Sequence, residues 1–199
     1  EKKYMQHVEE LYSTDEYKEK TREFLREEFK YMRSFTKDIF TSFEEKSIVA
    51  QGEIMSTNMV LNYLQEQGIK ATLLSAFDFM RTDKNAEPDA QYIKEKLTAI
   101  MTENEGYQIY ITQGFICLNA YGEIDNLQRG GSDFTASLIG VALGAEEIQI
   151  WTDIDGMHNN DPRIVDETDA IRQLNFEEAA ELAYFGAKIL HPTCVQPAK

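Results

Sequence analysis

The first 46 residues carry apolar side chains at helical spacing. Phe24, Leu25, Phe29, Met32 and Phe35 recur mostly three or four positions apart, with charged residues between them. Neither glycine nor proline occurs in this region. The pattern predicts a helical hairpin whose charges form a solvated face, with a break near residues 13–15.

From Ser47 onward the pattern alternates between helices and strands. A helix is predicted to follow Gly52 and to end at Gly68, and Pro88 is expected in the first turn of the next one. Asn175, with Glu178 three residues on, is typical of a helix start, and Gly186 of a helix end. The complete set is helices at 53–68, 88–101, 132–144 and 175–186, and strands at 69–74, 107–112 and 147–152. This alternation predicts an α/β fold in which helices cover a parallel sheet.

Length and charge narrow the class of protein. The 199 residues suit one domain or part of a larger protein, and the start at Glu1 indicates an excised segment. No apolar run has membrane-spanning length, and no signal peptide is recognisable. The net charge of −15 argues against nucleic acid and anionic membranes as partners. Cys117 and Cys194 are interpreted as buried thiols of a reducing cytoplasm.

Cations are scarce in the second half of the chain. After residue 100 the basic residues are Arg129, Arg163, Arg172, Lys188 and Lys199. Three of them lie beside glycine or proline in motif-like segments, which indicates an anionic ligand.

The segment "LQRGGSDFTASLIGVALGA" (127–145) contains the first candidate site. Gly130 and Gly131 let the backbone turn sharply near a ligand, and Ser132 can cap the helix whose free N–H groups favour anions. Arg129 offers a bidentate donor for carboxylate or phosphate, whereas Asp133 suits lysines or a substrate ammonium. A capped helix with an incidental Arg–Asp ion pair explains the same spacing equally well.

Three further positions are candidates. In "WTDIDGMHNNDPR" (151–163), Thr152 and Asp153 could contact a nucleotide and Arg163 its phosphates, although an acidic turn is an equal alternative and the EF-hand spacing is absent. Lys188 follows a helix end, where a lysine ordinarily balances the helix dipole. Glu53 is expected in a first helical turn, either as ordinary stabilisation or to recognise an amino group.

Taken in order, several motifs resemble the catalytic domain of the aspartokinases in the amino acid kinase family. They are "QGEIMST", "TQGFI", "QRGGSDFTASLIGVALGA", "WTDIDGMHNNDPRIV" and "FGAKILHP". The resemblance runs from about Ser47 to the end, so we divide the chain into a helical segment at 1–46 and a catalytic core at 47–199.

The resemblance implies a three-layer αβα sandwich of the carbamate kinase-like type with a mainly parallel sheet. It also implies the reaction ATP + L-aspartate → 4-phospho-L-aspartate + ADP with Mg²⁺, an early step of lysine, threonine and methionine biosynthesis in the cytoplasm, by a homo-oligomer. The implied aspartate contacts are Glu53, Arg129 and Ser132, and the implied catalytic residues are Asp133 and Lys188. The implied ATP contacts are Thr152, Asp153, His158, Arg163, Lys188 and Ile189.

Two departures from the family pattern stand out. His158 occupies a position where the family usually has tyrosine, which puts the adenine contacts there in doubt. The family's Lys-Phe-Gly-Gly strand and C-terminal regulatory domains do not occur in these 199 residues, so we expect the chain alone to be inactive. The alternatives are a kinase for glutamate or N-acetylglutamate, although Glu53 with Arg129 favours a free α-amino acid, and a non-catalytic subunit of the same fold.

Overall fold

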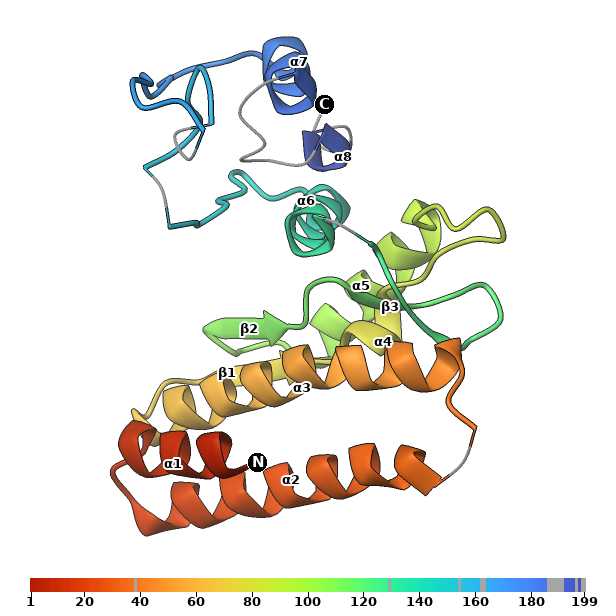
Figure 1. The fold of residues 1–199 in the computed structure, drawn as a ribbon, viewed down its shortest axis with the longest axis vertical. Coiled ribbons are helices and arrows are strands. Elements are labelled where there is room, and N and C mark those ends of the chain that lie inside the picture. Colours follow the sequence, from red (N-terminus) through yellow and green to blue (C-terminus); the bar gives the residue numbers. More distant parts are fainter. Residues whose placement is uncertain are drawn as a thin grey trace.

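The computed structural model describes residues 1–37, 39–128, 130–153, 155–161, 164–185, 192–195 and 197. Two kinds of element alternate after an N-terminal helical pair (Figure 1). The helices are α1 (Lys2–Leu11), α2 (Asp15–Ser34), the 3₁₀ turn η1 (Phe35–Lys37), α3 (Ser42–Glu66), α4 (Ala76–Phe79), α5 (Ala90–Glu103), α6 (Gly131–Leu143), α7 (Phe176–Phe185) and α8 (Pro192–Val195). The strands are β1 (Ala71–Leu74), β2 (Ile109–Thr112), β3 (Ile116–Leu118) and β4 (Ile124–Asn126).

The predicted N-terminal hairpin is present and packs against α3. Val8 of α1 and Leu25 of α2 are fully buried in one cluster with Met55 and Met59 of α3. The hydroxyl of Tyr12 donates a hydrogen bond of 2.8 Å to the carbonyl of Met59. The hairpin therefore supports α3 through this buried cluster and hydrogen bond.

The break between α1 and α2 lies at residues 12–14, as the sequence predicts. The carboxylate of Glu66 accepts hydrogen bonds from the backbone N–H groups of Ser13 (3.0 Å) and Thr14 (2.7 Å). It thereby satisfies donors that a helix start leaves without an intrahelical partner.

Helix α3 begins earlier than the sequence indicates and crosses the division drawn at residues 46 and 47. Thr41 and Glu44 form a reciprocal capping box that starts the helix ahead of Ser42. Gly52 consequently lies inside the helix, because one interior glycine costs only about 1 kcal/mol and the cap and packing offset it. The predicted end at Gly68 is confirmed: its φ is +76°, and Ile69 N–H bonds to the carbonyl of Leu64 at 3.0 Å.

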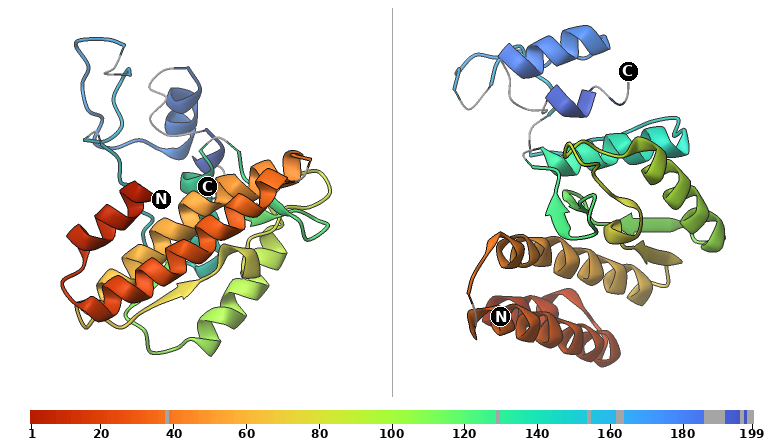
Figure 2. Two further views of the ribbon diagram at one scale, coloured as in Figure 1. Left: turned by 60° about the horizontal axis from the view of Figure 1, so that its bottom comes forward. Right: turned by 90° about the vertical axis from the view of Figure 1, so that its right-hand side faces the viewer.

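The parallel pair β1–β2 lies between helical layers. Ala71 pairs with Ile109 and Leu74 with Thr112, so the carboxyl ends of both strands coincide. Helix α3 covers one side, and α6 with α5 lies on the other (Figure 2). A core that includes Phe79, Ile93 and Ile116 fills the interior, and an antiparallel hairpin, β3–β4, continues from β2. The α/β fold expected from the alternation is confirmed.

The predicted strand at 147–152 is not a strand in the structure. These residues form no ladder with any other described segment. Ile148 packs on α6 beside Gly140, but the side chain of Trp151 is 88% exposed. A strand is defined by pairing with a neighbouring backbone, and an alternating sequence alone supplies only one of the two partners.

Helix starts also differ from expectation at α5. Asp89 caps this helix by accepting from the N–H of Tyr92 at 3.1 Å, so Pro88 precedes the cap and does not lie in the first turn. The other capping prediction is confirmed at α7, where Asn175 and Glu178 exchange hydrogen bonds of 2.9 and 2.8 Å. The predicted helix end at Gly186 lies outside the described residues.

Both cysteines are buried, as predicted. Burial raises the pKa of Cys117 to about 12, which leaves its thiol protonated and unreactive at neutral pH. Among the described helices, none combines the length and apolar composition that crossing a membrane requires.

Candidate active site

The turn that follows β2 lies directly against the start of α6. A Cβ atom added to Gly114 would lie 3.0 Å from both Cα and Cβ of Ser132. One added to Gly131 would lie 2.7 Å from Cδ2 and 3.2 Å from Cα of Phe115. Only glycine permits such approaches, so Gly114 and Gly131 are required for packing between these two segments.

The start of α6 differs in detail from the sequence interpretation. The N-cap is Gly130, with φ +75°, and Ser132 is a residue of the first turn, not its cap. A left-handed cap favours glycine over serine. The Ser132 side chain is therefore exposed and remains available to a ligand.

Asp133 is half-buried in the same first turn. A carboxylate there is favoured by the positive end of the helix dipole. The geometry thus places one acid among N–H donors that otherwise favour anions, as the sequence predicts.

Thr135, to which the sequence analysis assigned no role, links the turn after β2 to the start of α6. Its buried hydroxyl accepts a hydrogen bond from Phe115 N–H at 3.1 Å and donates one to the carbonyl of Gly131 at 2.8 Å. Phe115 itself adopts a left-handed conformation, φ +70°. A hydroxyl inside an otherwise small and apolar helix was the available signal for this contact.

Helix α3 reaches the same turn from the opposite side. Gln113 donates from Nε2 to the hydroxyl of Thr57 at 3.0 Å, and Thr57 donates to the carbonyl of Glu53 at 2.7 Å. Glu53 is half-buried in the interior of α3, not in a first turn. Because Glu53 and Thr57 are four residues apart, both side chains lie on the helix face that meets the turn.

Glu53 and Ser132 thus flank one short turn at the carboxyl ends of β1 and β2. Ligands of open α/β sheets bind at this end of the strands. The segments on either side of the turn therefore carry an acid, a hydroxyl and the N–H groups of a helix start, a set that suits a small ligand bearing both an ammonium and carboxylates.

The loop that contains the nucleotide candidates has its own internal bonds. Thr152 and Asp153 are exposed, and the Thr152 hydroxyl donates to Asp153 Oδ1 at 3.1 Å. His158 is buried, with Nδ1 2.9 Å from the Thr168 hydroxyl and Nε2 2.6 Å from Asp155 Oδ1. This hydrogen bond holds the pKa of Asp155 below its ordinary value. Both ring nitrogens of His158 are therefore occupied within the loop.

Four of the predicted site residues lie outside the described part of the chain. They are Arg129, Arg163, Lys188 and Ile189.

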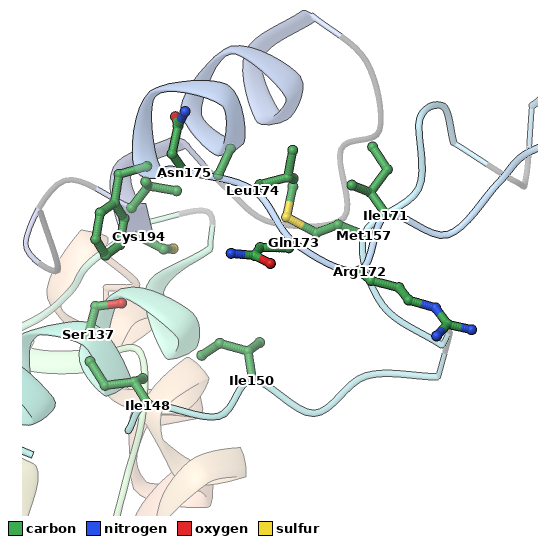
Figure 3. A pocket seen from close by; sticks show the side chains of 13 residues that line it. Ser137, Ile148, Ile150, Met157, Ile171, Arg172, Gln173, Leu174, Asn175 and Cys194 are labelled. Carbon is green, nitrogen blue, oxygen red and sulfur yellow. The ribbon is translucent and has the colours of Figure 1, made fainter. Parts of the chain in front are cut away.

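A separate cavity of about 340 Å³ lies between α6, the 147–152 segment, residues 171–176 and α8 (Figure 3). Its lining is mainly apolar, with Ile148, Ile150 and Leu174 among its walls, and the guanidinium of Arg172 points away from Cys194. None of the predicted site residues that the structure describes lines it. Its chemistry suits apolar packing more than charged ligands, and we place the candidate site at the β2–α6 junction.

A sequence model of the amino acid kinase family matches residues 4–199. The chain belongs to the amino acid kinase family. Among curated members, lysine-sensitive aspartokinase 3 of Escherichia coli strain K12 is 42% identical over 156 residues, which cover 76% of this chain and 34% of that protein. The aspartokinase of Chlamydia muridarum is 37% identical over 158 residues, 77% of this chain and 36% of that one.

Solved structures of this kinase family give the same result. Escherichia coli aspartokinase III in complex with aspartate and ADP superposes with a TM-score of 0.81 at 36% identity, covering 89% of this chain and 41% of that one. The same enzyme in complex with lysine and aspartate gives a TM-score of 0.77 at 35% identity, covering 92% and 42%. The resemblance inferred from the motifs is confirmed, and the chain spans about a third of the length of these curated amino acid kinases.

Proposed function

We propose that the protein containing this chain is an aspartate kinase, which transfers the γ-phosphoryl group of ATP to the side-chain carboxylate of L-aspartate. The observation that carries the proposal is that the α3 segment with Glu53 and the α6 start with Ser132 both contact the turn after β2. Family membership supports it, as do the aspartokinase names of the relatives and the aspartate and ADP in a structural neighbour.

The aspartate end of the site follows from charge. Arg129 and Ser132 bind the carboxylates of the substrate, and the carboxylate of Glu53 binds its ammonium. A bidentate guanidinium suits a planar carboxylate, and an acid at Glu53 selects an amino acid with a free α-amino group.

The nucleotide end is assigned to Thr152, Asp153, Arg163, Lys188 and Ile189. His158, predicted as a further ATP contact, instead holds the shape of this loop through its bonds to Asp155 and Thr168. A carboxylate oxygen of aspartate attacks the γ-phosphorus while ADP leaves, and catalysis consists mainly of positioning and charge neutralisation. Lys188 neutralises phosphate charge, and Asp133 holds lysine side chains in position.

Mg²⁺ fits the site as an ion that binds together with ATP. Protein-bound Mg²⁺ on nucleotides typically takes one or two carboxylates and several phosphate oxygens. The described residues hold no cluster of three acidic, histidine or cysteine ligands, whereas the exposed Asp153 can supply one carboxylate. When bound, Mg²⁺ neutralises phosphate charge. A homo-oligomer and a cytoplasmic location stay predictions.

The test is replacement of Arg129 by alanine in the whole protein that contains these residues. Loss of a charge-assisted contact costs about 2 kcal/mol, so kcat/KM for aspartate should fall roughly 30-fold while KM for ATP stays within about twofold. Steady-state kinetics with each substrate varied in turn measure this. Arg172→Ala, at an exposed arginine that lines the apolar cavity, is the control. An unchanged dependence of the rate on aspartate concentration would refute the assignment.

A further inference from the structure

We infer that Gln113 and Thr57 are positioning residues that fix Glu53 at the amino-group end of the site and so determine selectivity for a free α-amino acid. The inference rests on the proposed function. Neither side chain is expected to touch the substrate, and both act through the backbone of α3.

Gln113 joins three elements with one side chain. It is 3% exposed. Its Oε1 accepts from the N–H of Ala76, which opens α4 just after β1, at 2.9 Å, and its Nε2 donates to the Thr57 hydroxyl of α3 at 3.0 Å. Gln113 itself follows the last residue of β2, so it ties the ends of both strands to the helix that carries Glu53.

The donor and the acceptor can be assigned for each hydrogen bond in the series that runs from Ala76 through Gln113 and Thr57. A threonine hydroxyl has one proton, and the 2.7 Å contact with the carbonyl of Glu53 uses it because a carbonyl only accepts. The Thr57 oxygen must therefore accept from Gln113, which requires the amide N–H₂ at that end. The other end then presents the oxygen that the N–H of Ala76 needs. Only this orientation of the Gln113 amide satisfies both Thr57 and Ala76.

The carboxylate of Glu53 is available to bind a ligand. It is half-buried, yet within the described residues its carboxylate makes no hydrogen bond or ion pair. Desolvation of an unpaired carboxylate is unfavourable, and a ligand ammonium relieves that cost. Its position relative to the rest of the site is therefore functionally important.

The turn that begins at Gln113 also sets the position of Ser132, because Gly114 packs on it so closely that an added Cβ atom would lie 3.0 Å from Ser132 Cα and Cβ. Loss of the Gln113–Thr57 bond should let α3 move relative to β2 and α6. Such a shift changes the separation of Glu53 from Ser132 but leaves the nucleotide loop, which none of these bonds reaches, as it is.

The experiment compares L-aspartate with succinate, which keeps both carboxylates and lacks the amino group. In the whole wild-type protein that contains these residues, KM for aspartate should lie well below the inhibition constant of succinate. Thr57→Val keeps the β-branched shape and removes the hydroxyl, and Gln113→Met removes both amide contacts at similar length. The preference for aspartate is the ratio of the succinate inhibition constant to the KM for aspartate. Each substitution should reduce this ratio about tenfold and leave KM for ATP unchanged. Thr57→Ser restores the hydroxyl and should restore the preference.

Thr102→Val is the matched control. Thr102 of α5 also donates from its hydroxyl to the carbonyl four residues earlier, Thr98, at 3.0 Å, but on an exposed surface. It should lose no selectivity. If Gln113→Met fails to fold, Thr57→Val with Thr57→Ser decides the matter.

The outcomes separate the two claims. Wild-type protein that does not bind aspartate overturns the proposed function and this inference with it. Wild-type protein that prefers aspartate, together with folded Thr57→Val protein that keeps the full preference, overturns the positioning role alone. A loss of preference that Thr57→Ser does not restore also overturns it, because a merely structural effect of substitution would then explain the result.

Discussion

At the scale of single residues, the charge of Asp133 distinguishes a catalytic site from a capped helix. It is half-buried in the first turn of α6, beside the exposed Ser132. Its proposed task is to orient cations, which an uncharged amide of the same shape does poorly.

Asp133→Asn should lower turnover by about 100-fold or more at saturating substrates while the melting temperature changes little. Initial rates and a thermal melt followed by circular dichroism test both parts. Asp78→Asn, at an exposed acid in the first turn of α4, is the control for a generic helix-dipole effect. Near-wild-type turnover in folded Asp133→Asn protein would leave Asp133 with a stabilising role only.

Asp155 should contribute stability that depends on pH. Its hydrogen bond with His158 holds the pKa of Asp155 below the ordinary value. A folded-state pKa below the unfolded one means that stability is present above about pH 4, the unfolded value, and is lost as pH falls through the folded pKa.

Asp155→Ala should therefore melt at a lower temperature than wild type at pH 6, and the difference should shrink as the pH is lowered below about 4. Melting curves across this range measure it, with Asp166→Ala as an exposed control in the same region. A difference between wild type and Asp155→Ala that is constant with pH would contradict the linkage to this carboxylate.

The residues that the sequence identified and those it missed differ in a physical way. Glu53, Ser132 and Asp133 were predicted because they lie in motifs that resemble those of the aspartokinases. Gln113 and Thr135 received no role because their partners lie 56 and 20 residues away along the chain. Contacts of that separation become visible only once the fold brings the segments together.

At the scale of elements, glycines at two helix positions should respond in opposite ways to the same substitution. Gly52 lies inside α3 with no atom within 4 Å of an added Cβ, whereas an added Cβ at Gly131 meets the backbone and ring of Phe115. Alanine favours a helix interior over glycine by about 0.5–1 kcal/mol.

Gly52→Ala should raise the melting temperature by about 1–4 °C. Gly131→Ala should lower it, because Phe115 must move from a tightly packed position. Calorimetric melts of the two variants under one set of conditions compare them. A destabilised Gly52→Ala protein would show that the surface of α3 at this position is covered by another part of the molecule.

Periodicity predicted elements better than it predicted their ends or their partners. The helices at α5, α6 and α7 and the strands β1 and β2 occur where the pattern puts them, because burial of one face determines that pattern. The start of α3 was missed since the capping box at Thr41 outweighs an interior glycine. The segment 147–152 has a strand's alternation and no ladder, because pairing depends on what lies beside it.

At the scale of the whole molecule, the chain order alone predicted the α/β fold, and the motifs predicted the family. The position of Glu53 relative to Ser132 in the candidate site could not be predicted in this way. It depends on β1 and β2 ending in register, on the turn at residues 113–115, and on the close contact between Gly114 and Ser132. These are properties of assembled elements.

The chain's single tryptophan lies beside the residues proposed to bind the nucleotide. Trp151 is 88% exposed, its indole N–H donates to Gln149 Oε1 at 3.0 Å, and Thr152 and Asp153 follow it directly. Its fluorescence should therefore resemble that of free tryptophan and be quenched readily by iodide.

Addition of ATP with Mg²⁺ should change this emission and reduce the quenching, because nucleotide bound at Thr152 and Asp153 shields the neighbouring indole from solvent. L-Aspartate alone should have a much smaller effect, since its proposed contacts lie at the β2–α6 junction. Lys188→Met removes, at similar length, the charge proposed to bind phosphate, and should raise the half-saturating ATP concentration about tenfold. Arg172→Ala should titrate like wild type. A chain that binds ATP by isothermal titration calorimetry while its Trp151 emission stays constant through the titration would place the nucleotide away from this loop.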